Sequence, residues 1–542
     1  MFINFSDLPG HSNLFLDYLN EFDNLSHFFN LNFRDNTKFV SQFQSISNFN
    51  REHRSELSKI VRKQYEGVEI SPKTEKNISL LAEQNTITIV TGQQLGILGG
   101  PLYTIYKAIT AIKLARYLNE KYTRFNFLSL FWMESEDHDF EEISSISFID
   151  ENNNLQLVTY NDNLPVEENR GSTGNIKLKD SINEFIVEIN KLLRQSDFKE
   201  KNLQLINDCY KPGVTFKYSF KKLLLHLFDI YGLIIFDPQD VEVKNILKPI
   251  FKNEILNFRK HSEKLIQVSA ELEELYHAQV KVRAVNLFMN YEGGRYLIEP
   301  VEENSFRLKN KRVRFSEDEL LKLVDDKPES FSPNVLLRPI CQDYLFPTGF
   351  YVAGPGEIAY FAQVMPLYKF YDIPEPIIYP RSSATIIEKN ISSVLAKYRL
   401  TLPDFFIGNE KVIVKLIKKL SSVGVEDMFL NFSKDIDNSM LKLKTELSEI
   451  DKSIADSSER YKQKIYSSIE DFRNKALEAE KRKYESAIRQ TNRVLVNVYP
   501  NSVLQERELN YFAFSNKYGM DFINFVFTQL EINKFEHQII EL

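Results

Sequence analysis

The stretch of residues 86–103 constrains the fold more than any other part of the chain. It begins with an apolar run rich in β-branched residues (87–90), continues through a loop with four glycines, and reaches Pro101 at the start of an amphipathic helix. Proline suits the first position of a helix, because its missing N–H has no partner to lose there. The stretch therefore predicts a strand, a glycine loop and a helix, which is the opening unit of an α/β fold.

Such a junction is suited to an anionic ligand. The first turn of a helix has unpaired N–H groups at its positive dipole end, and glycines allow a phosphate or carboxylate to approach the main chain. The stretch is neither a Walker loop nor a G-x-G-x-x-G motif. The alternative is a turn that only lets a helix pack on a sheet. The candidate binding residues here are Gln93, Gln94, Gly99, Gly100 and Tyr103.

An acidic cluster follows the next predicted strand. The apolar run of residues 127–133 is followed at once by Asp137, His138 and Asp139, with further glutamates on both sides. In doubly wound sheets ligands bind at the carboxyl ends of strands. Carboxylates around an imidazole suit a substrate ammonium, a sugar hydroxyl or Mg²⁺. The alternative is an acidic helix start, because Asp and Glu favour that position.

A third stretch repeats the same order of strand, turn and helix. Residues 349–353 form a predicted strand before a Gly-Pro-Gly turn that contains Gly356, and Glu357 and Gln363 lie on the following helix. Glu357 either caps this helix or points into the cleft to bind an amine or ribose.

Two other places supply candidate polar side chains. Arg381 and Ser382 follow a strand at residues 376–380, where the arginine either clamps phosphate oxygens or is solvated beside a helix cap. His277 and Gln279 lie two residues apart before a predicted hairpin across residues 292–295, so they share a face if the chain is extended.

Composition limits the class of protein. The chain has 542 residues and a formal net charge of -7, which argues against nucleic acid as a bulk partner. Its two cysteines, Cys209 and Cys341, form no C-x-x-C pair, so we predict a reducing cytoplasm and no bound metal. We expect no secretory signal and no membrane span.

The C-terminal part has a different pattern. Apolar residues repeat at alternating spacings of four and three, which is a coiled-coil seam: Ile436, Met440, Leu443, Leu447, Ile450 and Ile454. The pattern continues less regularly, so the coiled coil covers about residues 434–497. Either one long helix or a two-helix hairpin fits it. The seam has to pair, by self-association or within the chain.

Several stretches together resemble the BshC family, the cysteine ligases of bacillithiol biosynthesis. The resemblance rests on Thr91-Gly-Gln-Gln-Leu-Gly96 with Gly99-Gly-Pro-Leu-Tyr103, on Phe131-Trp-Met133 with Glu136-Asp-His-Asp-Phe-Glu-Glu142, and on Gly354-Pro-Gly-Glu-Ile-Ala-Tyr-Phe-Ala-Gln363. Tyr276-His-Ala-Gln-Val280, Tyr379-Pro-Arg-Ser-Ser-Ala384 and Gln505-Glu-Arg507 agree with it, in the same order along the chain.

The resemblance implies a Rossmann-like core of parallel strands, as in class I synthetases and nucleotidylyltransferases, with two connecting inserts and a C-terminal helical coiled-coil domain that forms a homodimer. The predicted regions are the first part of the core (1–150), insert 1 (151–214), core continuation (215–240), insert 2 (241–332), core completion (333–400) and the helical region (401–542). The implied activity is the last step of bacillithiol synthesis, in which cysteine is joined to the amine of glucosaminyl-malate with ATP and Mg²⁺. The His-Ile-Gly-His and Lys-Met-Ser-Lys-Ser signatures of class I synthetases are absent.

Our hypothesis is therefore an ATP-dependent ligase. The loop from Gln93 to Tyr103 would hold the nucleotide or acyl phosphate, Asp137, His138 and Asp139 would orient the substrate amine or Mg²⁺, and Arg381 would clamp phosphate. Glu357 and Gln363 would contact the sugar or ribose. Two alternatives stay open: a non-catalytic coiled-coil scaffold, and a nucleotidylyltransferase acting on a small phosphate ester.

Overall fold

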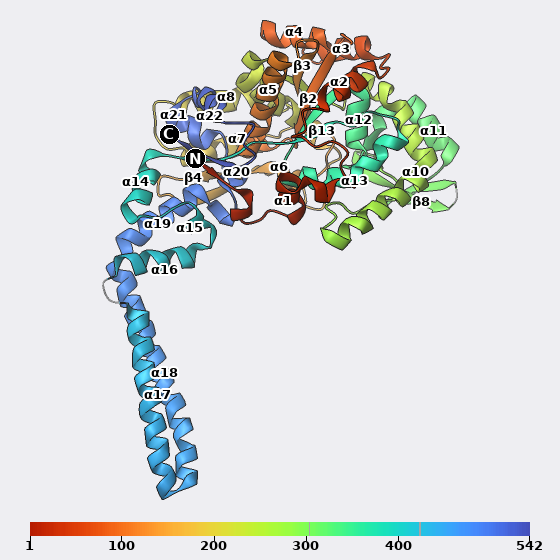
Figure 1. Cartoon of the computed structure of the whole chain (residues 1–542). Helices are drawn as coiled ribbons and strands as arrows, with labels where there is room; N and C mark the ends of the chain where they lie inside the picture. The colour runs from red at the N-terminus through yellow and green to blue at the C-terminus, as the bar shows by residue number, and fades with distance from the viewer. Residues whose placement is uncertain (303, 422–423) are drawn as a thin grey trace. The chain divides into compact units, whose positions relative to one another are not determined.

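The structure is a computed structural model that describes residues 1–302, 304–421 and 424–542 (Figure 1). It divides into two compact units. The first contains Met1–Thr385 together with Val503–Ile540, and the second contains Ile386–Ser502 with Glu541–Leu542. The chain thus leaves the first unit, builds the second, and returns.

A five-stranded parallel sheet forms the centre of the first unit, in the order β13-β12-β2-β3-β6. The strands are β2 (Thr86–Gln93), β3 (Asn126–Met133), β6 (Ile234–Phe236), β12 (Thr348–Ala353) and β13 (Ile377–Pro380). Numbered along the chain, this order is 3-2-1-4-5, so the winding direction changes between β2 and β12. This arrangement confirms the predicted Rossmann-like fold and places the ligand-binding switch point at the ends of those two strands.

The strand sequences explain why both faces of the sheet are covered. Nearly every residue of β2 and β3 is buried, as expected for parallel strands between helical layers. Helix α5 (Leu102–Lys121) packs against both strands. Gly92 allows β2 and β3 to approach at their carboxyl ends, because a Cβ there would lie 2.9 Å from the carbonyl oxygen of Trp132.

The first unit contains fifteen further α-helices in its described residues. They are α1 (Asn13–Asn20), α2 (Phe39–Asn48), α3 (Arg54–Lys63), α4 (Pro72–Leu80), α6 (Phe140–Ser144), α7 (Ser181–Leu192), α8 (Lys199–Cys209), α9 (Phe216–Phe228), α10 (Val241–Leu275), α11 (Glu317–Asp326), α12 (Arg338–Leu345), α13 (Pro355–Phe370), α20 (Gln505–Glu508), α21 (Phe512–Tyr518) and α22 (Phe522–Gln529).

A second five-stranded sheet has the order β10-β9-β8-β7-β11 and is antiparallel throughout. Its strands are β7 (Leu287–Tyr291), β8 (Gly294–Glu302), β9 (Ser305–Leu308), β10 (Arg314–Ser316) and β11 (Phe331–Pro333). The predicted hairpin is present, with Tyr291 opposite Gly294. Two smaller sheets complete the strands. Strand β4 (Ser145–Ile149) pairs with β5 (Leu155–Thr159), and a three-stranded sheet has the order β1-β15-β14, with β1 (Phe2–Ile3), β15 (His537–Glu541) and β14 (Ser383–Ile387).

The second unit contains a long antiparallel helical hairpin (Figure 1). Helix α17 (Val425–Ile450) ends at Asp451, whose carboxylate accepts hydrogen bonds from the amides of Ser453 and Ile454 and so starts α18 (Lys452–Lys483). Contacts such as Phe429 with Phe472 pair the two helices along their length. Of the two predicted arrangements, the hairpin is therefore the observed one.

Shorter helices complete this unit: α14 (Lys389–Tyr398), α15 (Pro403–Phe406), α16 (Asn409–Leu420) and α19 (Glu485–Val498). The division falls after Thr385 and returns Val503–Ile540 to the first unit. The predicted helical region covers 401–542, and this boundary stays a prediction. The limits of the two inserts stay predictions. In the part of the chain that the structure describes, we find no helix with the length and apolarity that crossing a membrane requires.

Candidate active site at the sheet switch point

A buried lysine connects the two strands of the switch point. Lys107 lies on α5, and its ammonium donates to the carbonyl oxygen of Gly92 at 2.8 Å and to Oε1 of Gln93 at 3.0 Å. The same ammonium forms an ion pair with Glu357 at 2.5 Å. Burial lowers the pKa of Lys107, and the Glu357 carboxylate opposes that shift. Lys107 therefore holds the end of β2 and the start of α13 together.

Glu357 is oriented on both of its carboxylate oxygens. One oxygen accepts a hydrogen bond from the backbone N–H of Gly354 at 2.7 Å, which closes a capping box at the start of α13, and the other accepts from the Tyr351 hydroxyl at 2.7 Å. Although burial alone would raise its pKa, Lys107 and the Gly354 N–H bring the pKa of Glu357 below its usual value. Of the two interpretations of this residue, the helix cap is observed.

A second buried pair lies beside the first. The Arg338 guanidinium on α12 contacts Glu134 at 3.0 Å, directly after β3, and donates to the hydroxyls of Tyr351 and Tyr360. Burial raises the pKa of Glu134 to about 7, and the arginine opposes the shift. Since Tyr351 contacts both Arg338 and Glu357, the two ion pairs form one network across three strand ends.

The acidic segment after β3 is organised by Gln94. Its amide nitrogen donates to Asp137 at 2.7 Å and to Glu142 at 2.5 Å, so the glycine loop and the acidic cluster are in direct contact. Burial raises the pKa of Glu142 and would raise that of Asp137, but hydrogen bonds from the Gln94 amide and from the backbone N–H of His138 lower the latter. Asp139 caps α6 by accepting from the Glu142 N–H at 3.1 Å, as the acidic helix start alternative predicts.

His138 is held by an arginine from the antiparallel sheet. The Arg295 guanidinium lies 3.0 Å from its Nδ1 and stacks on Phe288, and it is itself fixed by Ser332. A guanidinium only donates, so Nδ1 has to accept and the proton is on Nε2. In that state the 3.4 Å distance from Nδ1 to Asp137 is not a hydrogen bond. The His138 side chain is about half exposed.

The glycine loop is held by its own turns and by the returning chain. The amides of Gly96, Gly99 and Gly100 all donate within the loop, which agrees with the alternative of a packing turn for these residues. The Asn510 side chain donates to the carbonyls of Leu98 and Gly100. These three glycine amides are therefore not available to a phosphate.

The start of α5 retains unused binding capacity. The Leu102 amide donates to the carbonyl of Leu509 in the returning chain, but the fully buried hydroxyl of Thr104 in the first turn has no partner among the described residues. Unpartnered buried hydroxyls are costly unless a ligand or water satisfies them. An anion at this helix start would also interact favourably with the helix dipole.

A cavity of about 260 Å³ opens beside this helix start. Its polar lining includes Gln93, Gln94, Tyr103, Glu142 and Arg507, and its apolar wall comes from β4 and β5. Burial raises the pKa of Tyr103 to about 12, so its hydroxyl keeps the proton at neutral pH. The glycine loop and the acidic segment thus meet at one hollow, which also receives an arginine from the returning chain.

Arg381 and Ser382 are used within the protein. The Arg381 guanidinium is buried, donates to Glu506 at 2.6 Å, and lies 5.5 Å from the ring centre of Tyr103. The Ser382 hydroxyl donates to the carbonyl of Glu531 at 2.8 Å. Arg381 therefore anchors α20 next to the cavity, and phosphate clamping by this residue stays a prediction.

The remaining candidates lie further from the strand ends. Gln363 is buried and lies six residues after Glu357 on α13, which is a rise of roughly 9 Å along the helix axis at about 1.5 Å per residue. Its side-chain oxygen accepts from the Val280 amide, and its side-chain nitrogen donates to the Val280 carbonyl. His277 is exposed and contacts Glu273, and Gln279 is exposed as well. Gly356 faces open space, because a Cβ added there would meet no atom of the described residues beyond its chain neighbours within 4 Å.

The sequence analysis missed the cations that organise this site: Lys107, Arg295, Arg338 and Arg507. Lys107 lies in an otherwise apolar stretch of α5, where a charge has to be paired, and this signal could have indicated it. Arg295 is the second residue of β8, just after a hairpin turn, and nothing in that local sequence indicates a functional role. In the described part of the chain, no three His, Cys, Asp or Glu side chains are grouped as a metal site.

Comparison with known proteins agrees with the geometry. Residues 1–382 match the N-terminal Rossmann-like domain of bacillithiol biosynthesis BshC, and residues 384–542 match the C-terminal coiled-coil domain of the same family. A protein of Chloroherpeton thalassium is 36% identical, covering 98% of this chain and 96% of its own length. A protein of Salinibacter ruber is 32% identical, covering 98% and 97%.

Both relatives carry the name "Putative cysteine ligase BshC". The matches extend over nearly the whole chain, and the two matched domains correspond to the parallel sheet and the helical hairpin described above. The chain therefore belongs to the BshC family of bacillithiol biosynthesis.

Proposed function

We propose that this protein is an ATP-dependent ligase that forms an amide bond between cysteine and the amine of glucosaminyl-malate, the last step of bacillithiol synthesis. The observation that carries the proposal is the convergence of the ends of β2, β3 and β12. Lys107 contacts Gln93 and Glu357 there, and Gln94 contacts Asp137 and Glu142. The relatives' name supplies the ligase class.

The start of α5 fits a phosphate group. The unpartnered Thr104 hydroxyl would donate to a phosphate oxygen, and the positive dipole end of α5 would stabilise its charge. When bound, ATP supplies the phosphoryl or adenylyl group that makes a carboxylate electrophilic. Lys107, Arg338 and Arg381 are each neutralised by a carboxylate, so we assign them to positioning.

The acidic segment fits an amine. Asp137 and Glu142 lie together on Gln94 and would favour an ammonium in the cavity. The attacking amine has to lose a proton, and a nearby imidazole can accept one. His138, which carries its own proton on Nε2, would take it on Nδ1 once Arg295 moves away, and Asp137 at 3.4 Å would then stabilise the imidazolium. Holding both substrates at one hollow lowers the entropic part of the barrier.

The test is turnover by the purified full chain with ATP, Mg²⁺, cysteine and glucosaminyl-malate. Mass spectrometry should detect the thiol product, and AMP or ADP should appear in equal amount. Nucleotide release without cysteine would instead indicate a nucleotidylyltransferase, and absence of both products would indicate a scaffold.

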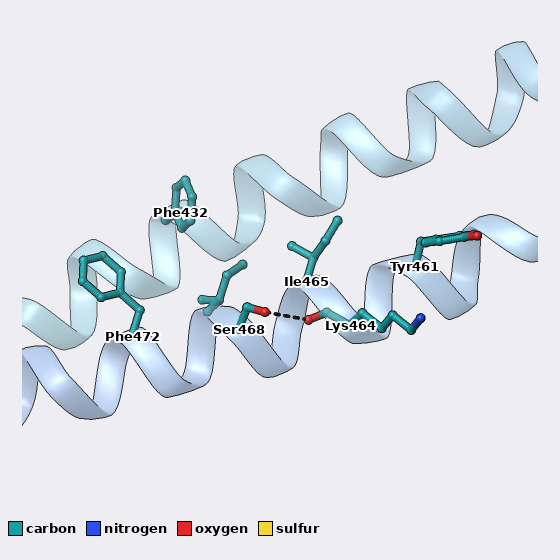
Figure 2. A pocket seen from close by; sticks show the side chains of 7 residues that line it. Phe432, Tyr461, Lys464, Ile465, Ser468 and Phe472 are labelled. Carbon is teal, nitrogen blue, oxygen red and sulfur yellow. Dashed lines mark hydrogen bonds between the residues drawn. The ribbon is translucent and has the colours of Figure 1, made fainter.

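We also propose that the protein self-associates through the helical hairpin. Phe432 and Phe472 line a groove of about 380 Å³ on α17 and α18, with Tyr461 and Ile465 further along it (Figure 2). The exposed fraction of Phe472 is 65% and that of Tyr461 is 59%. A contiguous exposed apolar surface is typical of an interaction site. Sedimentation of the full chain across a range of concentrations tests this proposal.

A further inference from the structure

The cavity beside α5 contains two opposite charges that do not neutralise each other. Arg507 lines it, its side chain is exposed, and we find no ion pair or hydrogen bond of its guanidinium within the described residues. Glu142 lines the same cavity and, within the described residues, its carboxylate accepts a hydrogen bond from the neutral amide of Gln94 and forms no ion pair. Because no ion pair joins the two, their charged atoms lie more than 4.0 Å apart.

The other polar groups in and beside the cavity also differ between the part near Arg507 and the part near Glu142. Glu508 accepts a hydrogen bond from Ser147 at 2.5 Å, so it is already oriented by the protein. Tyr103 accepts from Gln93 at 3.3 Å, which leaves its hydroxyl hydrogen for an acceptor near Arg507. Asp137 accepts a hydrogen bond from the same Gln94 amide nitrogen as Glu142, so it adds negative charge near Glu142. One part of the cavity thus favours a carboxylate and another an ammonium.

We propose that this cavity binds a small molecule carrying both a carboxylate and an amine, with the carboxylate on Arg507 and Tyr103 and the ammonium on Glu142. A guanidinium binds a carboxylate through two parallel N–H donors, which makes it suited to this role. The apolar wall of Ile146 and Leu157 would contact the carbon atoms between the two groups. The inference rests on the proposed function and identifies where one of its two substrates binds.

Both substrates of the proposed reaction have this chemistry, and binding experiments distinguish them. Isothermal titration calorimetry of the full chain, without ATP, would use L-cysteine alone and glucosaminyl-malate alone. If cysteine is the ligand, N-acetylcysteine and cysteine methyl ester should bind at least about ten-fold more weakly, since each lacks one charge. If glucosaminyl-malate is the ligand, its N-acetylated form should show the same loss.

Two variants test the assigned residues. Arg507→Gln and Glu142→Gln should each weaken binding of that probe about ten-fold or more, whereas Arg507→Lys should lose less. Arg312→Gln and Glu120→Gln remove the same charges from exposed positions away from the cavity and should bind like the wild type. Thermal unfolding of each variant would confirm that it is folded.

Two results would overturn the inference: no binding of either probe to the wild type, or equal affinity of the wild type and both cavity variants. Failure of the ligase proposal is distinguishable. In that case the wild type would bind a probe with the charge dependence above but would form no thiol product with ATP.

Discussion

The sheet edge of the first unit buries charged side chains, whereas the helical hairpin of the second unit exposes apolar ones. At the sheet edge, charged groups are buried and each has a partner, as in the pairs of Lys107 with Glu357 and Arg338 with Glu134. On the hairpin, apolar rings such as Phe472 are exposed. Buried charges fix geometry at a cost in desolvation, and exposed apolar surface is retained where a partner covers it. The first pattern therefore indicates chemistry and the second indicates association.

The largest expected effect is the loss of stability when the buried ion pair of Lys107 and Glu357 is broken. Lys107→Met leaves the Glu357 carboxylate without its cation, and breaking such a pair typically costs about 3–5 kcal/mol of folding free energy. Urea unfolding should measure a loss of roughly 3 kcal/mol, together with loss of ligase turnover.

The double variant Lys107→Met/Glu357→Gln is the control for that measurement. It removes both charges and should recover at least about half of the lost stability, because no unpaired charge remains. If the double variant is as unstable as the single one, the pair is not the source of the effect.

His138→Ala tests the proposed general base and should leave the fold intact. The imidazole is half exposed, so stability should stay within about 0.5 kcal/mol of the wild type. Turnover should fall about 100-fold or more, as for loss of a general base. His27→Ala, at an exposed histidine paired with Glu271, is the matched control and should turn over normally. Wild-type turnover by His138→Ala would remove this role.

Substitutions in the hairpin groove should change association and leave catalysis unchanged. Phe472→Ser removes an exposed ring from the hairpin groove, so we expect self-association to weaken by roughly ten-fold, about 1.4 kcal/mol. Sedimentation equilibrium measures this directly. Tyr117→Ser removes a partly exposed ring from the first unit and should leave association unchanged. Unchanged association of Phe472→Ser would argue for pairing within the chain only.

The smallest expected effect is the pH dependence of the sheet edge. Burial raises the pKa of Glu134 to about 7, above its unfolded value of 4.5. Between these two values the folded protein binds the proton more strongly, so its free energy of unfolding should fall as pH rises toward 7. In Glu134→Gln this contribution disappears, and the two stability curves should differ in slope by up to roughly 1 kcal/mol per pH unit over that range. Parallel curves would show that Arg338 keeps Glu134 ionised throughout.

Local pattern was enough to predict the elements that carry the site. The strand, loop and helix order around Gly96, the acidic segment at His138 and the capping role open to Glu357 could all be read from neighbouring residues, because hydrophobic period and turn chemistry act over a few positions. The seam from Ile436 to Ile454 likewise predicted a coiled coil. It did not show that Asp451 ends one helix and starts the next.

The partners of each side chain could not be predicted in this way. Arg295 reaches His138 from a strand more than 150 positions further along the chain, and Arg507 joins the cavity after the chain has left the first unit and returned. No periodicity relates such distant residues.

The sequence by itself determined the family, the Rossmann-like core, the coiled coil and the stretches that carry polar groups to the strand ends. Only the tertiary structure decided that the glycine amides are used within their own loop, that Lys107 pairs with Glu357, and that Arg507 and Glu142 share one cavity without pairing. The physical reason is that helix and strand patterns depend on near neighbours, whereas burial and charge pairing depend on which distant segments the fold brings into contact.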